Sequence, residues 1–292
     1  MATTIDPALV ALVAQKAIDA LGPSIAPFRA FSTNFSDEVA DVGSSVGVNV
    51  LGRATPVTSG TVDYTQTGGT VSHVSVSLNQ RQYASADFTD IQLASLNDST
   101  MEQLLKGQLR EVLASAHSVA LAALQTTEYT ASASNAFTFN DLLAIRKQMS
   151  TLGLPTEGRS LLLSPDANTL LLGDETISRS FASRVVDTAL GEGVVDRIAG
   201  FDCYEVSAIS DCYGYAVVPS ALAVASRYLP DDAADWCIGV RDEQSGLTFG
   251  IKMMSDSLRA KKYIATELIF GVAAVAASSD ETRALKISAA AV

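Results

Sequence analysis

Two histidines are the first candidates for acid–base chemistry in this sequence. His73 lies in a stretch that alternates polar and apolar residues, and His117 lies within a long helical pattern. The sequence contains neither a GxSxG nucleophile elbow nor a Walker GxxxxGK[ST] motif. We therefore interpret both histidines as packed or solvent-facing residues and predict no catalytic residues. A hydrolase that combines one of them with a nearby Asp and Ser is kept as a remote alternative.

Metal and nucleotide chemistry also find little support. Asp231, Asp232 and Asp235 could hold a divalent cation, but such a charged group is typical of a solvated loop. Asp166–Leu170 begins like a calcium loop and then places leucine where the fifth position needs an oxygen ligand. Gly191–Asp196 lacks the last glycine of a dinucleotide fingerprint. We predict no metal and no cofactor.

Charge and cysteine usage narrow the function classes further. The chain has 292 residues and a net charge of -12, which argues against a groove that neutralises a phosphate backbone. Cys203, Cys212 and Cys237 are odd in number and form no CxxC pair, which favours reduced thiols. No apolar stretch approaches the ~20 residues that cross a bilayer. With no secretory pattern at the start, we expect a soluble protein made in a cytoplasm, without a membrane partner.

The N-terminal region contains the segment predicted to act as an arm. The pattern from Ile5 to Leu21 predicts an amphipathic helix, a mobile or docking arm, with one apolar side formed by Ile5, Leu9, Leu12, Val13, Ala17 and Leu21. Three phenylalanines follow without sustained periodicity, as expected if they lie against another surface: Phe28, Phe31 and Phe35.

Two alternating stretches predict a long β-hairpin. Valines recur with period two from Val46 to Val50, and a second alternation runs from Val74 to Leu78. The apolar face is too thin for such a hairpin to be stable by itself. A neighbouring subunit is expected to cover it.

The rest of the chain reads as mixed helix and strand. The strongest signal is a helix from Ser99 to about Thr126, a rod of about 40 Å. Further helices are predicted at Phe139–Leu152, Pro165–Leu172 and Ser220–Tyr228, and strands at Arg159–Leu163, Phe201–Val206, Tyr215–Val218, Leu247–Ile251, Tyr263–Phe270 and Leu285–Ile287. The long helix and the last three strands are expected to form one discontinuous domain, which the chain leaves near Asn135 and re-enters near Asp231.

Several short segments, taken in order, carry a resemblance to a known family. They are the hairpin strand Val74–Leu78 leading into Phe88–Asp90, the long helix, DLLAIRKQMSTLGLP (Asp141–Pro155), RSLLLSP (Arg159–Pro165), DRIAGF (Asp196–Phe201) and PSALA (Pro219–Ala223). Their order and spacing resemble the major capsid proteins of tailed phages. That fold, named after the Hong Kong 97 phage, is shared by encapsulin nanocompartments.

The resemblance implies an α+β fold with four parts. Residues 1–45 would form an N-terminal arm and residues 46–90 an extended loop. Residues 91–135 and 231–292 would form a peripheral domain around the long spine helix, and residues 136–230 an axial α/β domain around five-fold and six-fold centres. The extended-loop range contains no lysine, so the lysine–asparagine cross-link of some family members is not carried over to it.

The implied function is a shell subunit that encloses the double-stranded DNA genome of a tailed phage. Its partners would be many copies of itself in pentamers and hexamers, a separate scaffolding protein, a portal, decoration proteins and packaged DNA, touched non-specifically. It would be assembled in the host bacterial cytoplasm and reside in the virion capsid. An encapsulin-like shell protein is the alternative, whereas a β-rich adhesin is opposed by the missing export signal and the long helix. The predicted inter-subunit contacts are Phe28, Phe31, Phe35, Tyr64, Gly68, Gly69 and Arg81.

Overall fold

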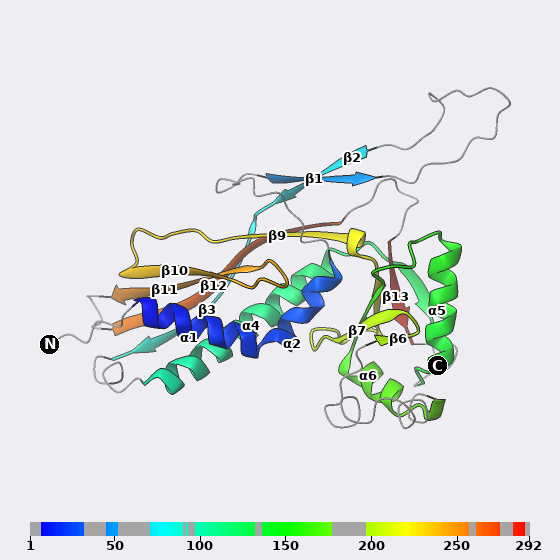
Figure 1. Cartoon of the computed structure of the whole chain (residues 1–292), viewed down its shortest axis with the longest axis horizontal. Coiled ribbons are helices and arrows are strands. Elements are labelled where there is room, and N and C mark those ends of the chain that lie inside the picture. The colour runs from blue at the N-terminus through cyan, green and yellow to red at the C-terminus, as the bar shows by residue number, and fades with distance from the viewer. Residues whose placement is uncertain are drawn as a thin grey trace.

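The chain was analysed as a computed structural model, which describes residues 7–31, 45–51, 71–89, 92, 97–131, 136–176, 197–256, 261–274 and 283–289. Its architecture is α+β, with a five-stranded sheet, a six-stranded sheet and a two-stranded ribbon. In Figure 1 the five-stranded sheet lies with α1 and α4 on the left, and the six-stranded sheet lies with α5 and α6 on the right. None of the helices in the described ranges combines the length and apolar character needed to cross a membrane.

The helical elements are α1 (Pro7–Ala20), α2 (Gly22–Ile25), η1 (Ala26–Ala30), α4 (Asp98–Ala122), α5 (Phe139–Thr151), α6 (Pro165–Leu172) and η3 (Pro219–Ala221). The strands are β1 (Ser45–Leu51), β2 (Val71–Ser77), β3 (Gln80–Phe88), β4 (Thr127–Thr130), β5 (Ser160–Leu163), β6 (Arg197–Ile198), β7 (Phe201–Glu205), β8 (Gly214–Val217), β9 (Leu222–Arg227), β10 (Trp236–Arg241), β11 (Thr248–Asp256), β12 (Lys261–Ala274) and β13 (Ala284–Ser288).

The long helix α4 lies on the five-stranded sheet, whose order is β10-β11-β12-β3 with β9 also paired to β12. Asn97 caps the helix by accepting a hydrogen bond from the Thr100 amide at 2.8 Å, one turn before the apolar stripe begins. Gln108 then fixes the helix to β12, because it donates to the Ile264 carbonyl at 2.9 Å and accepts from Thr266 at 2.8 Å. The predicted spine helix is confirmed, although it ends at Ala122 rather than near Thr126.

The six-stranded sheet has the order β4-β13-β8-β5-β7-β6 and mixes parallel with antiparallel pairs. Helix α5 packs through Leu142, Ile145 and Met149, all buried at helical spacing. At its C-terminal end the buried Arg159 guanidinium donates to the carbonyls of Leu154 at 2.9 Å and Pro155 at 2.7 Å. This cation satisfies carbonyls of the turn that follows α5, which ends at Thr151.

One predicted element and one predicted strand pairing were wrong. The expected helix Ser220–Tyr228 is instead the turn η3 followed by strand β9, which pairs antiparallel with β12. Its sequence, LAVASR, contains good helix formers, but burial of Leu222–Ala225 against the sheet overrides that local preference. The strand at Leu285–Ile287 exists, but β13 pairs with β4 and β8 and not with the strands of the five-stranded sheet.

Strand pairing therefore shifts the edges of the predicted domains. β3 from the predicted extended loop (46–90) and β9 from the predicted axial range (136–230) both pair with β12. β4 and β13, which fell in the predicted peripheral ranges 91–135 and 231–292, belong to the six-stranded sheet. The chain thus crosses between the two sheets more often than the sequence predicts, and the division into functional domains stays a prediction.

The N-terminal helix α1 packs against α4 and β10 of its own chain. Val13 and Ala17 face this contact as predicted, whereas Leu12 is 56% exposed. The buried positions Val10, Val13, Ala14, Ala17 and Ile18 follow helical spacing, which places Leu12 on the opposite side. The predicted amphipathic helix is confirmed, and it packs within its own chain; its role as a mobile or docking arm stays a prediction.

Candidate assembly surfaces

The ribbon β1–β2 is the predicted hairpin. Its two strands pair antiparallel over seven residue pairs, from Ser45 opposite Ser77 to Leu51 opposite Val71. In Figure 1 it forms a layer of its own beyond β9, on the side away from α1 and α4. At its base Val76 is fully buried and lies close to β12, so one end of the ribbon is anchored in its own subunit.

The strand β3 continues from the hairpin and presents a polar row to solvent. Exposed and half-buried residues alternate along it, with Arg81, Tyr83, Ser85 and Asp87 outward. β3 is the last strand in the order of its sheet, and Tyr83 is 69% exposed. We call these four residues the β3 row. An exposed aromatic ring beside charged groups on an edge strand is suited to contact with another protein.

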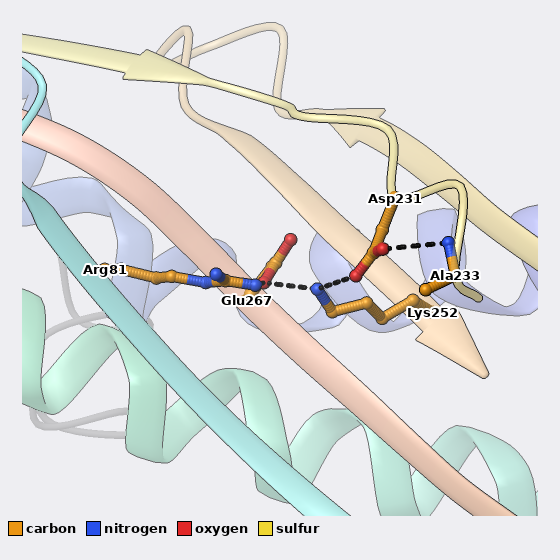
Figure 2. A network of polar contacts seen from close by, with 5 residues as sticks. All are labelled: Arg81, Asp231, Ala233, Lys252 and Glu267. Carbon is orange, nitrogen blue, oxygen red and sulfur yellow. Dashed lines mark hydrogen bonds and ion pairs between the residues drawn. The ribbon is translucent and has the colours of Figure 1, made fainter. Parts of the chain in front are cut away.

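A network of ion pairs lies next to the β3 row (Figure 2). Glu267 of β12 binds Arg81 at 2.6 Å on one side and Lys252 of β11 at 2.9 Å on the other. Lys252 also binds Asp231 at 3.1 Å, in the segment between β9 and β10. The hydrogen bond from Lys252, and then one from the Ala233 amide, lower the pKa of Asp231. The network joins three adjacent strands and a connecting segment at the place where the hairpin leaves the sheet.

Burial within this network is uneven. The side chains of Glu267 and Lys252 are only 3% and 6% exposed, whereas that of Arg81 is 54% exposed. Two buried opposite charges must stay paired, because leaving either one alone in the sheet is costly. Arg81 binds Glu267 through its guanidinium, while much of the Arg81 side chain is exposed to solvent. Its predicted role as an inter-subunit contact remains a prediction.

The phenylalanines of the N-terminal segment behave differently from the prediction. Phe28 is fully buried and Phe31 is 4% exposed within the subunit itself. The Phe28 ring stacks on His117 of α4, with 4.4 Å between ring centroids. The prediction that Phe28 and Phe31 contact another subunit was wrong, because both side chains are buried within their own chain. Four further predicted contacts lie outside the described residues: Phe35, Tyr64, Gly68 and Gly69.

His117 lies in the core of the subunit. The residue is 8% exposed, and its Nε2 has no hydrogen-bond partner within the described part of the chain. Burial lowers the pKa of His117 to about 4, so the ring is neutral at neutral pH. The side chain of His73, on β2, lies outside the described residues.

A cavity of about 770 Å³ opens between the N-terminal segment, α4 and β7. Its polar lining includes Arg29, Arg110, Glu111 and Glu205, and His117 lies at its wall. Glu205 accepts a hydrogen bond from Asn168 at 2.6 Å. The lining mixes both signs of charge.

The described residues contain no cluster of His, Cys, Asp and Glu suited to a metal ion. Two members of the predicted acidic group have other partners. Asp231 pairs with Lys252, and Asp235 accepts a hydrogen bond from Ser255. Asp231 and Asp235 thus hold the segment before β10 against β11.

No family model and no curated protein matches this sequence. Solved structures of phage capsids do match the fold. The capsid structure of the Cyanophage P-SCSP1u is 15% identical, with 90% of this chain and 87% of that chain covered and a TM-score of 0.56. The mature capsid of bacteriophage PhiM1 is 13% identical, with 91% and 87% covered and a TM-score of 0.53.

The acidic stable capsid structure of Helicobacter pylori bacteriophage KHP30 is 9% identical, with 89% of this chain and 87% of that chain covered and a TM-score of 0.54. At sequence identities this low, the structural likeness shows a shared fold. The chain therefore has the phage capsid fold, as the order of its sequence segments predicted.

Proposed function

We propose that this chain is a capsid shell subunit of a tailed phage, and that it is a structural protein and not an enzyme. The observation that carries the proposal is the extent of the match. The cyanophage capsid chain is covered over 87% of its length, together with 90% of this chain. The likeness therefore extends over nearly the whole of both chains, as expected if the two share a shell-building role.

The surfaces used for assembly would be the β1–β2 hairpin and the β3 row. Both lie on one continuous stretch of chain, and the ion-pair network holds the start of β3 in place. A second copy that covers them would supply the apolar surface that a two-stranded ribbon lacks. Obligate interfaces of this kind bury more than ~2,000 Å² in total. Closed symmetry would then fix the number of copies, in pentamers and hexamers.

The remaining partners follow from the same proposal. A separate scaffolding protein would direct assembly in the host cytoplasm, and a portal would occupy one vertex. Decoration proteins would bind outside the finished capsid, and packaged DNA would touch its inner surface non-specifically. With a net charge of -12, the chain would repel DNA more than bind it.

The proposal is tested by purifying the protein, with and without its phage's scaffolding protein, and examining it by size-exclusion chromatography and electron microscopy. We expect closed shells of uniform diameter that contain pentamers and hexamers. Replacing both His73 and His117 by Ala should still give shells that contain pentamers and hexamers. The subunit itself would be less stable, because His117 would lose its contact with Phe28. A monomer under every condition would contradict the proposal. Shells that enclose a co-expressed enzyme, without portal or DNA, would favour the encapsulin-like alternative.

A further inference from the structure

The corner where the hairpin joins the five-stranded sheet contains one unusually close approach of two backbones. Residue Gly271 of β12 lies beneath the end of β2, between its neighbours in the sheet, Ala225 of β9 on one side and the start of β3 on the other. A Cβ atom placed on Gly271 would be 2.8 Å from the carbonyl carbon of Ser77 and still closer to its oxygen. Real Cβ atoms essentially never come so near to a backbone.

Glycine is required at position 271 because a side chain would not fit, and not because of its backbone conformation. Gly271 is not among the glycines with positive φ, so its backbone conformation is open to any residue. A glycine inside a strand often marks the place where another backbone approaches closely. The close approach of the β2 backbone therefore explains why glycine stands at position 271. Any side chain there would force the end of β2 away from the sheet.

The crossing backbone has little freedom to move aside. The Ser77 carbonyl also accepts a hydrogen bond from the Asn79 amide at 3.0 Å, which closes a tight bend between β2 and β3. Val76 beside it is fully buried, and its Cγ1 would be 3.0 Å from the added Cβ. Gln80 then pairs with Phe270, the residue next to Gly271. Contacts before, at and after the crossing thus hold it in one geometry.

We propose that Gly271 is the positioning residue of the hairpin: its contact with Ser77 sets the angle at which β1–β2 leaves the subunit. This inference rests on the proposed function, since the angle matters because the hairpin must meet a neighbouring copy. The paired part of the hairpin is seven residues long, or roughly 23 Å at ~3.3 Å per residue. A lift of about 1 Å at the base, the least that an added methyl group requires, becomes several times larger at the far end of a lever of this length.

The test compares Gly271→Ala with Gly107→Ala, the same substitution in α4 at a site where a Cβ meets nothing within 4 Å. Spin labels on cysteines introduced at Ser72, which pairs with Val50 near the far end of the hairpin, and at the exposed Ser85 report the distance between hairpin and sheet in the unassembled subunit. The native cysteines are replaced by Ala in all variants. Assembly is followed separately by light scattering and electron microscopy.

We expect Gly271→Ala to shift the label distance by several ångströms and to reduce the yield of regular shells at least tenfold. Gly107→Ala should match the parent protein in both measurements. An unchanged label distance, or an unchanged yield of regular shells, in Gly271→Ala would overturn the proposal. If the parent protein itself never assembles, the proposed function fails, while the label distance still decides whether Gly271 sets the angle.

A second variant keeps the test informative if Gly271→Ala does not fold. Val76→Ala removes the buried side chain at the crossing without adding an atom, and we expect it to broaden the distribution of label distances. A distribution as narrow as that of the parent protein would show that the hairpin angle is fixed elsewhere.

Discussion

The N-terminal segment and the β1–β2 hairpin share one feature in the sequence but pack differently in the structure. Each contains apolar residues without enough neighbouring apolar residues to bury them. The N-terminal segment buries Phe28 against His117 of α4 in its own chain, whereas the hairpin is seated on its own sheet at its base, at Val76, and otherwise forms a layer of its own in Figure 1. The difference teaches that a shortage of local apolar partners indicates a long-range contact, but not whether that contact lies within one subunit or between two.

The largest effect is expected from Phe28→Ala, which tests the intramolecular half of this comparison. The ring is fully buried and stacks on His117, so its removal leaves a cavity under η1. We expect a loss of about 4 kcal/mol in the free energy of unfolding of the unassembled subunit, measured by denaturant titration. Leu12→Ala is the control, because Leu12 is 56% exposed on α1 and its truncation should cost less than about 0.5 kcal/mol. Equal effects of the two variants would mean that the segment is not docked in solution.

The next largest effect is expected from Glu267→Gln, which removes the charge at the centre of the ion-pair network. Lys252, with a side chain only 6% exposed, would keep Asp231 as its remaining charged partner. We expect the free energy of unfolding to fall by about 3 kcal/mol, because breaking one partner of a buried pair leaves a poorly compensated charge.

The matched control is Glu102→Gln, which breaks the half-buried i,i+4 pair with Lys106 on α4. Pairs of this kind contribute about 0.5 kcal/mol or less. If both variants unfold at the same denaturant concentration, the network does not stabilise the sheet from which the hairpin extends.

Acid should weaken the N-terminal contact through His117. Burial lowers its pKa to about 4 in the folded subunit, from 6.5 in the unfolded chain. The unfolded state therefore binds more protons between these values, and stability falls as pH falls from about 6.5 towards 4, by up to ~3 kcal/mol. Comparing the slope of unfolding free energy against pH in wild type and His117→Gln isolates this contribution from the carboxylates. Identical slopes would contradict the buried, neutral histidine.

The smallest effect on the subunit is expected from Tyr83→Ala, which sharpens the intermolecular half of the comparison. Because Tyr83 is 69% exposed, its truncation should change the free energy of unfolding by less than about 0.5 kcal/mol. Assembly followed by light scattering should nevertheless slow clearly, since aromatic residues contribute strongly to interfaces. Normal assembly kinetics would exclude Tyr83 from the contact between copies.

Local signals in the sequence were enough to predict much of the fold. The apolar period of α4 and the two valine alternations are each visible within a short window. The strand β9 was missed because its small residues carry no strong strand signal, and only pairing with β12 makes it a strand.

The features of the candidate site that escaped prediction all depend on distant residues. The partner of Phe28 is His117, and Glu267 meets Arg81 only because β12 pairs with β3. The role of Gly271 depends on where β2 crosses the sheet, and the sequence around it contains nothing that predicts a crossing. Arg81 was predicted as an inter-subunit contact, and that role stays a prediction.

Hydrogen–deuterium exchange of the β1–β2 amides, compared between isolated subunits and assembled shells, tests the central claim most directly. We predict that the ribbon beyond Val76 exchanges readily in the isolated subunit and becomes strongly protected in the shell. Residues 10–31 should be protected to the same degree in both states. Equal protection of the ribbon before and after assembly would contradict the claim that a second copy completes it.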